Sequence, residues 1–257
     1  MQHRPMLGVF ITGTDTGVGK THIGVLLAKA LSAKNIRVIP RKPVESGCAV
    51  IDGELMPADA QALKQAADYS GGLSDICRYR FEAPVSPPRA AHLANRPVTT
   101  EQLLEACVHN RENGFTLVEG AGGFYSPLSE DGLNADLATA LQLPVLLVAE
   151  DALGALNQVL MSVEAIQAHG LNLVGVVLNR LNKLQDERMD NAADLRERLD
   201  CAVFVQEYNN DCLPDELVNR ILTPPATASP HFSPGSREQA QDEARMSHQM
   251  DEPSLDL

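Results

Sequence analysis

Basic residues and long apolar runs are both scarce in this sequence. It has 21 Lys and Arg against 34 Asp and Glu, which gives a formal net charge of −13. Proteins that bind nucleic acid neutralise phosphates with clustered Lys and Arg, so we expect no nucleic-acid partner. No apolar run approaches the roughly 18 residues that a membrane span needs. The first run, residues 7–11, is also too short for the core of a signal peptide, so we expect no membrane association.

Aromatic residues and paired cysteines are also lacking. Trp is absent and aromatic residues make up 4% of the chain, so the 44% of hydrophobic residues must form a core mainly from Leu, Val, Ala and Ile. The five cysteines are scattered, odd in number and without C-x-x-C spacing. They fit reduced thiols better than disulfides or a metal site, which predicts a cytoplasmic protein.

Apolar runs alternate with helical patterns along the chain, and no internal repeat is visible. Residues 145–148 are apolar throughout, which is typical of strands buried on both faces of a parallel sheet. The alternation predicts an α/β fold, with a doubly wound, mainly parallel sheet and helices on both faces. The predicted strands are residues 7–11, 37–44, 115–118, 144–149, 173–178 and 202–205. The predicted helices are residues 21–34, 59–69, 100–110, 134–141, 157–169, 186–199 and 214–222.

The composition changes at Thr223. The segment that follows holds five prolines, one aromatic residue and a net acidic charge. Such a segment cannot bury enough apolar surface to offset the entropy lost on ordering. The sequence therefore predicts a single α/β domain over residues 1–222 and a disordered, acidic, proline-rich tail over residues 223–257.

A glycine-rich stretch, GTDTGVGKT at residues 13–21, lies between a predicted strand and a predicted helix. That context is typical of a phosphate loop, and the fold is therefore expected to be P-loop NTPase-like. Backbone N–H groups and the helix dipole would bind the phosphates, Lys20 would reach the β- and γ-phosphates, and the Thr21 hydroxyl would bind Mg²⁺. The standard spacing has glycine where Thr14 stands. The alternative, an ordinary turn with an exposed lysine, agrees less well with the flanking strand and helix.

Polar residues follow several of the predicted strands, at the edge where open α/β sheets bind ligands. They are residues 42–47, 119–123, 150–151 and 179. Taken alone, Lys42 could be a surface lysine, Glu119 a strand-end charge, and Asp59 an acidic residue favoured by a helix dipole. Their common position at one edge favours a shared site. Glu119 ends an apolar strand, where a carboxylate could bind Mg²⁺.

The motifs together resemble those of the dethiobiotin synthetase family over about residues 6–180. The matching motifs are GTDTxVGKT from Gly13, KPVxSG from Lys42, Asp59-Ala60, APVSP from Ala83, VEGAGG from Val118, Pro127-Leu128, LPV from Leu143, Gly154-x-x-Asn157, and Gly170-Leu171 with Asn179. An extra residue in the first loop is typical of that family, which accounts for the spacing at Thr14. Several motifs in a fixed order are far more specific than a phosphate loop alone.

This resemblance implies ATP-dependent closure of a cyclic urea in biotin biosynthesis. The substrates would be 7,8-diaminononanoate, carbon dioxide and ATP, with a carbamate and a carbamic–phosphoric anhydride as intermediates. By the same resemblance, Lys20 and Lys42 would face the carbamate and the transferring phosphate, and Ser46 would bind the carbamate or diamine end. Thr21, Asp59 and Glu119 would hold Mg²⁺.

The resemblance also implies a homodimer with its site near the interface. Asn157 would reach the carboxylate end of the substrate across that interface, and Asn179 would contact the nucleotide base. The residues expected to bind the nucleotide are Gly17, Val18, Gly19, Lys20, Thr21, His22, Asp59, Glu119, Gly120, Ala121, Gly122 and Asn179.

The sequence departs from the family pattern at three places, and two alternative functions stay open. Gly17 stands where some members carry Glu, Pro88 stands where His is expected, and residues 201–212 lack the Gly-x-Ile-Pro stretch that wraps the base. Base preference is therefore open, and a catalytically weak, nucleotide-binding paralogue is one alternative. A regulatory ATPase of the partition or cell-division type is the other, although such proteins carry Lys at the position of Asp15 and often end in a basic membrane helix.

Overall fold

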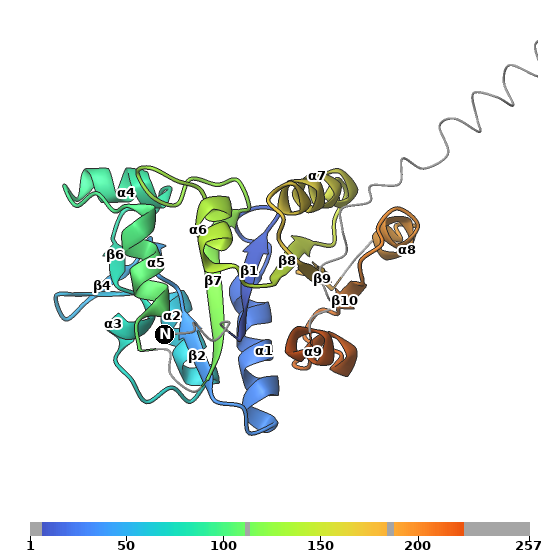
Figure 1. The fold of residues 1–257 in the computed structure, drawn as a ribbon, viewed down its shortest axis with the longest axis horizontal. Helices are drawn as coiled ribbons and strands as arrows, with labels where there is room; N and C mark the ends of the chain where they lie inside the picture. Colours follow the sequence, from blue (N-terminus) through green and yellow to red (C-terminus); the bar gives the residue numbers. More distant parts are fainter. Residues whose placement is uncertain (1–6, 111–113, 184–187, 224–257) are drawn as a thin grey trace, which may run out of the picture. The chain divides into compact units, whose positions relative to one another are not determined.

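The fold is built on a sheet of six strands (Figure 1). The computed structural model describes residues 7–110, 114–183 and 188–223, which all lie in one compact unit of the chain. In spatial order the strands are β10 (Val203–Gln206), β9 (Leu173–Asn179), β8 (Val145–Glu150), β1 (Gly8–Gly13), β7 (Phe115–Gly123) and β2 (Val38–Arg41). Every neighbouring pair is parallel, which confirms the predicted sheet.

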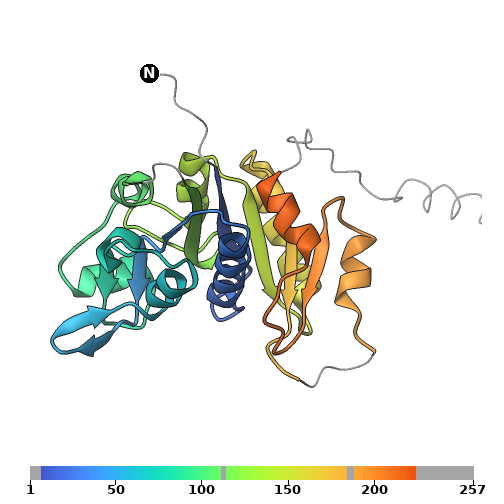
Figure 2. The ribbon, with the colours of Figure 1, turned by 90° about the horizontal axis from the view of Figure 1, so that it is seen from below.

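Helices cover both faces of this sheet (Figure 2). Successive side chains of a strand point to opposite faces, so Val9 and Ile11 of β1 lie in one core and Phe10 lies in the other. The first core includes residues of α1 (Lys20–Ala33), α2 (Ala58–Ala66) and α9 (Asp215–Leu222). The second includes residues of α5 (Thr100–Val108), α6 (Asn134–Leu141), α7 (Ala155–Ala168) and α8 (Asn191–Arg196). The predicted doubly wound arrangement is thus confirmed.

The second predicted strand is too long. It was expected to run to Val44, but β2 ends at Arg41. Pro43 has no N–H group to donate to a strand ladder, and the Lys42 N–H donates to the carbonyl of Ile76 instead. Val44 begins a separate strand, β3 (Val44–Ser46), which pairs in parallel with β6 (Tyr79–Phe81).

The predicted helices are present, but four differ by two or more residues at an end. α5 ends at Val108 rather than residue 110. α7 begins at Ala155 rather than residue 157, because Gly154 provides its N-cap with φ 95°. α2 ends at Ala66 rather than residue 69, and Asp68 just beyond it has a left-handed φ of 46°. α8 covers only residues 191–196 of the predicted 186–199, and residues 184–187 lie outside the described residues.

Several short elements between β2 and α5 were not predicted. Besides β3 and β6 they are β4 (Ala49–Ile51), β5 (Glu54–Met56), α3 (Leu73–Ile76) and α4 (Pro87–Leu93). β4 and β5 form an antiparallel hairpin whose turn residues, Asp52 and Gly53, have φ 52° and 82°. An Asp-Gly turn with two positive φ values is a common hairpin connection, so this signal was available in the sequence.

Three further predictions concern the cysteines, membrane-spanning helices and the C-terminal tail. All five cysteines are free in the structure. Across residues 7–110, 114–183 and 188–223, no helix has both the length and the apolar character needed to cross a membrane. The predicted tail lies outside the described residues except for Thr223, so the division into a domain and a disordered tail stays a prediction.

Candidate functional site

A cavity of about 620 Å³ opens at the carboxyl ends of β1, β2 and β7, and we call it the rim cavity. Ten of the residues predicted from the sequence line it: Gly17, Gly19, Lys20, Thr21, Lys42, Ser46, Asp59, Glu119, Ala121 and Gly122. The other lining residues are Thr16, Glu45, Pro84, Val85, Ser86, Pro87, Ser126 and Pro127. Residues from distant parts of the sequence therefore meet at one place, as their common position at strand ends predicted.

The phosphate loop connects β1 to α1 along one wall of the rim cavity. Gly17 and Gly19 have φ of 80° and 93°, which is a conformation that side chains with a Cβ atom rarely adopt. Gly19 is the N-cap of α1, and no side chain caps this helix end. The Lys20 ammonium donates a hydrogen bond of 2.8 Å to the carbonyl oxygen of Asp15. The helix end thus offers its N–H groups and its dipole to an anion, as a phosphate loop requires.

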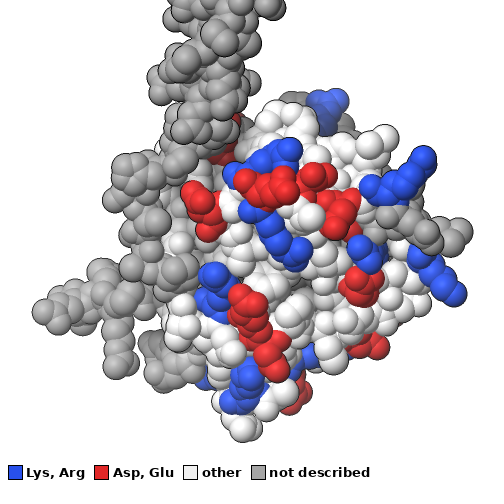
Figure 3. Space-filling model, turned by 90° about the vertical axis from the view of Figure 1, so that its right-hand side faces the viewer, with Lys and Arg blue, Asp and Glu red and all other residues white. Residues whose placement is uncertain are grey.

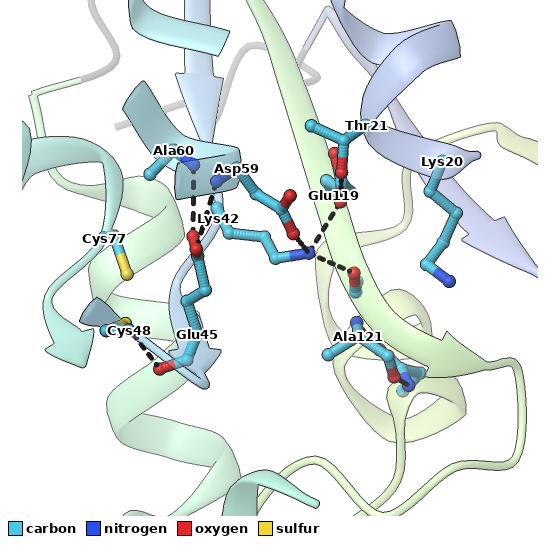
Figure 4. Close-up of polar contacts among 12 residues, drawn as sticks. Lys20, Thr21, Lys42, Glu45, Cys48, Asp59, Ala60, Cys77, Glu119 and Ala121 are labelled. Carbon is cyan, nitrogen blue, oxygen red and sulfur yellow. Dashed lines mark hydrogen bonds and ion pairs between the residues drawn. The ribbon is translucent and has the colours of Figure 1, made fainter. Parts of the chain in front are cut away.

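A cluster of charged side chains lies on the opposite wall (Figure 4). The buried Lys42 Nζ is 2.6 Å from Glu119 Oε1, 3.0 Å from Asp59 Oδ2 and 3.1 Å from the carbonyl oxygen of Gly120. The Thr21 hydroxyl donates to the same Glu119 Oε1 at 2.8 Å. Two of the three residues predicted to hold Mg²⁺, Asp59 and Glu119, therefore contact the ammonium group of Lys42, and the third, Thr21, contacts Glu119.

The two lysines of the rim cavity differ in acidity. Burial, with a contribution from the charge of Lys42, lowers the pKa of Lys20 from 10.5 to about 8. Burial opposes the charged form of Lys42 as well, but the carboxylates of Glu119 and Asp59 outweigh it and raise the pKa of Lys42 above its ordinary value. In the same way Lys42 outweighs burial and lowers the pKa of Asp59. Lys42 is therefore a fixed positive charge.

The oxygen atoms in this cluster fit a magnesium ion. Glu119 Oε2 is buried without a hydrogen-bond partner, although a buried carboxylate oxygen normally has one. Mg²⁺ is usually held by one or two carboxylates together with substrate phosphate oxygens, and here two carboxylates and one hydroxyl lie beside the phosphate loop. Among the described residues, no group of three or more His, Cys, Asp or Glu side chains could hold a metal ion. The donors thus match Mg²⁺ shared with a bound nucleotide.

Asn179 lies beneath the phosphate loop. Its Nδ2 atom donates to the carbonyl oxygen of Val18 at 3.0 Å, and the side chain is buried. A Cβ atom on Gly19 would lie only 2.1 Å from that Nδ2 atom. Asn179 thus holds the loop from the end of β9, and its predicted contact with a nucleotide base stays a prediction.

Four other predicted residues do not line the rim cavity. The carbonyl of Val18 accepts the hydrogen bond from Asn179, and the carbonyl of Gly120 accepts one from Lys42. His22 is exposed on the first turn of α1, and Asn157 is exposed on the first turn of α7. Ser46 does line it, and its hydroxyl donates to the carbonyl of Val85 at 2.7 Å. Its contact links β3 to the loop before α4, and the predicted contact between Asn157 and a substrate in another subunit stays a prediction.

The sequence analysis gave no role to Glu45, whose carboxylate is buried in the wall of the rim cavity. Its oxygens accept hydrogen bonds from the backbone N–H groups of Asp59 at 3.0 Å and Ala60 at 3.1 Å (Figure 4). The sequence offered one signal for a role of Glu45, namely a charged residue between Lys42 and Ser46. Ser126, which accepts a hydrogen bond from the N–H of Gly123, had no comparable signal.

The far edge of the sheet carries ion pairs instead of a cluster that faces the rim cavity. Asp151, beyond β8, accepts hydrogen bonds from Arg180 at 3.0 Å and from Asn191 at 2.9 Å. Arg180 also contacts Glu207, which follows β10. Figure 3 shows this side, where α8, β10 and α9 lie, with basic and acidic side chains next to one another. Asp151 is thus committed to structural contacts.

A family model and several known proteins match most of this chain. A family model described as an AAA domain matches residues 7–206, from β1 to β10. The chain is 36% identical over 217 residues to ATP-dependent dethiobiotin synthetase BioD of Ruthia magnifica subsp. Calyptogena magnifica, covering 84% of this chain and 99% of that protein. It is 42% identical over 192 residues to the protein of the same name from Anaeromyxobacter dehalogenans strain 2CP-1, covering 74% of this chain and 84% of that protein. The similarities span the phosphate loop and the strands that carry the rim cavity.

Proposed function

The chain belongs to the dethiobiotin synthetase family, and we propose that its rim cavity is where the substrates of this family react. Its activity is ATP-dependent dethiobiotin synthesis, a ligase reaction of biotin biosynthesis that forms carbon–nitrogen bonds. The substrates are small molecules: 7,8-diaminononanoate, carbon dioxide and ATP. One observation supports the assignment to this cavity. Lys20 lies on one wall, and Lys42 lies on the other, where it forms ion pairs with Asp59 and Glu119.

The proposed reaction has three steps. One amine of the diamine attacks carbon dioxide and loses a proton, which gives a carbamate. A carbamate oxygen then attacks the γ-phosphorus of ATP, ADP leaves, and a carbamic–phosphoric anhydride forms. The second amine attacks the carbonyl carbon of this anhydride and expels phosphate, which closes the cyclic urea. Negative charge gathers from both reactants in the second step, so two positioned ammonium groups would stabilise it.

The two lysines take different parts in this proposal. Lys20 lies in the phosphate loop and would follow the γ-phosphate as it transfers. Lys42 comes from the end of β2 and would face the carbamate, while Ser46 would donate a hydrogen bond to the carbamate or the diamine. Because the carboxylates around Lys42 keep it charged, its charge is present before the substrates bind. Such preorganised charge lowers the barrier without reorganisation during the reaction.

Thr21, Asp59 and Glu119 are the residues that would hold Mg²⁺ beside the nucleotide. The unpartnered Oε2 atom of Glu119 supports this proposal. The ion would neutralise part of the charge on the phosphate oxygens. Asp59 and Glu119 would then divide their negative charge between the ion and Lys42, so that the lysine stays in place while the nucleotide binds.

We also propose a homodimer that places Asn157 at the substrate of the neighbouring subunit. Leu153, Asn157 and Met161 follow one another at four-residue intervals, and Leu153 and Met161 are 97% and 56% exposed. Leu153 lies in the turn just before α7 (Ala155–Ala168), and Asn157 and Met161 lie on the helix itself. Large exposed apolar side chains that lie close together are typical of an interface. In sedimentation experiments we expect a dimer that Met161→Glu converts to monomers. A Met161→Glu protein that sediments like the unmodified dimer would contradict this interface.

One assay separates the proposed activity from the two alternatives. Dethiobiotin formation should require ATP, 7,8-diaminononanoate and carbon dioxide together, and should be visible by mass spectrometry. A weak paralogue would bind nucleotide without product, and a regulatory ATPase would hydrolyse ATP without stimulation by the diamine and bicarbonate. The free state of all five cysteines supports a reducing, cytoplasmic compartment, which cell fractionation would test.

A further inference from the structure

We propose that Glu45 is a positioning residue for the magnesium site, because it holds the start of α2 and thereby the carboxylate of Asp59. This inference rests on the proposed function of the rim cavity. Glu45 is not adjacent in the sequence to any of the predicted magnesium ligands. It acts from β3, 14 residues before Asp59, through the two backbone hydrogen bonds at 3.0 Å and 3.1 Å.

The first turn of α2 has no cap of its own. Its N-cap residue is Pro57, whose side chain has no oxygen to accept a hydrogen bond, and no side-chain cap is present at that position. The N–H groups at the first turn of a helix need acceptors from outside the helix, and a carboxylate there is also favoured by the helix dipole. Glu45 supplies one oxygen to Asp59 and the other to Ala60, the second and third residues of the helix. Glu45 therefore caps α2 from outside the helix, from its place in β3.

The chain between Glu45 and α2 gives little other support to this helix start. It runs through the β4–β5 hairpin, and all three residues of β4 are exposed. Glu45 itself is well anchored: it pairs with Arg80 of β6, and its carbonyl accepts a hydrogen bond from the Cys48 thiol at 3.4 Å. The two hydrogen bonds from α2 thus join the helix start directly to β3, past the exposed hairpin that connects the two in sequence.

Asp59 carries the consequence to the site. The same residue whose N–H is held by Glu45 places its Oδ2 atom 3.0 Å from Lys42 Nζ. A shift of the α2 start would move this carboxylate relative to Glu119 on β7.

The test measures metal affinity separately from turnover. Mn²⁺ binding to the ADP complex, followed by electron paramagnetic resonance, should weaken about tenfold in Glu45→Ala, as expected when a group that orients a metal ligand is removed. Glu45→Gln should weaken it by a few-fold, because one oxygen can still accept a hydrogen bond, and this variant serves if Glu45→Ala fails to fold. ADP affinity in metal-free buffer should stay within about twofold of the unmodified protein, because the phosphate loop is untouched.

Two further variants distinguish positioning from simple stabilisation. Thr99→Ala removes the cap of α5, a helix of the same nine-residue length as α2, and should lower the melting temperature without changing Mn²⁺ affinity. Pro57→Ser added to Glu45→Ala supplies a local cap and should restore most of the Mn²⁺ affinity. Failure of this rescue, with Mn²⁺ affinity still low, would overturn the positioning role and favour a direct contact of Glu45 with the bound ligands.

Asp59→Asn separates the failure of this inference from that of the magnesium site. Mn²⁺ affinity should fall in Asp59→Asn, and adding Glu45→Ala should then change it little, because Glu45 acts through Asp59. If Asp59→Asn lowers the affinity and Glu45→Ala does not, the positioning role is wrong and the magnesium site stands. If Asp59→Asn leaves the affinity unchanged, the magnesium site itself is wrong, and the inference falls with it.

Discussion

Each wall of the rim cavity positions one lysine, and the two walls do so through different contacts. On the phosphate-loop wall Lys20 donates to the carbonyl of Asp15, five residues away. On the opposite wall Lys42 reaches Asp59 and Glu119, which are 17 and 77 residues away in the sequence. The first lysine has a lowered pKa and the second a raised one. Lys20 can therefore lose its charge as the pH rises, whereas Lys42, which lies between two carboxylates, stays charged.

The fold explains how the distant partners meet. β2 and β7 are parallel neighbours in which Arg41 lies opposite Val118. The next residue of each segment is Lys42, just past the end of β2, or Glu119, which lies within β7, so the two side chains lie at the same level of the sheet. The phosphate loop depends less on such pairing, because its glycines and helix end lie within one stretch of sequence and Asn179 adds one hydrogen bond from β9.

Replacing Lys20 by Ala should produce the largest loss. A positioned cation at the transferring phosphate is removed, so dethiobiotin formation should fall by about 10²–10³ or more. Lys29→Ala is the matched control, because Lys29 is exposed on the same helix and should leave the rate unchanged. Product formation can be followed by mass spectrometry. A Lys20→Ala protein with nearly normal turnover would show that the phosphate-loop assignment is wrong.

Replacing Lys42 by Gln should separate rate from nucleotide binding. Gln keeps a hydrogen-bond donor but removes the charge, so diamine-dependent turnover should fall by about 10². Calorimetry should find nucleotide affinity within a few-fold of normal, because the loop and Lys20 still bind the phosphates. Equal losses of binding and turnover would instead make Lys42 a phosphate ligand. No change in either would show that the charge of this buried lysine has no catalytic part.

The sequence predicted the two walls unequally, for a physical reason. The main elements of the phosphate loop, the strand, the glycines and the helix, are local and have a strong pattern. The opposite wall depends on β3, β6 and the β4–β5 hairpin, which have three residues per strand and too little periodicity to recognise. Lys42 and Asp59 could be placed near the site from strand ends and family resemblance, but the role of Glu45 follows from hydrogen bonds between separate elements.

Two glycines of the phosphate loop offer a test of how local its shape is. Gly17 and Gly19 both have positive φ, but a Cβ atom on Gly17 would meet nothing within 4 Å, whereas one on Gly19 would displace Asn179. Gly17→Ala should therefore show only backbone strain, of about 1–2 kcal/mol. Gly19→Ala should in addition disturb the loop and lower ADP affinity by roughly tenfold, since it also loses the Asn179 hydrogen bond, worth about 1 kcal/mol.

The coupling between these two residues can be measured directly. Asn179→Ala removes the side chain that the new Cβ atom would meet, so the losses in Gly19→Ala and Asn179→Ala should add up to more than the loss in the double variant. The readouts are ADP affinity by calorimetry and the free energy of unfolding in urea. Strict additivity of the losses would show that Asn179 does not hold the loop through its contact at Val18.

The smallest expected effect concerns the adjustable charge of Lys20. Its pKa of about 8 in the free protein means that about nine-tenths of Lys20 is charged at pH 7 and about half at pH 8. Phosphate binding favours the charged form and raises this pKa in the complex. ADP affinity is therefore fully present below about pH 7 and declines as the pH rises through 8, by about twofold between pH 7 and pH 8.

This pH effect distinguishes the two lysines because only one of them should titrate. Calorimetry in metal-free buffer, with EDTA, keeps Mg²⁺ out of the measurement, and ADP phosphates are ionised throughout the range because their last pKa is about 6. The carboxylates of Glu119 and Asp59 keep Lys42 charged, so it contributes no slope. Lys20→Arg should abolish the slope whatever its absolute affinity, because a guanidinium group stays charged. A slope that persists in Lys20→Arg would assign the titration to another group. A flat profile in the unmodified protein would show that Lys20 is as firmly charged as Lys42, and the contrast between the two walls would then lie in their partners alone.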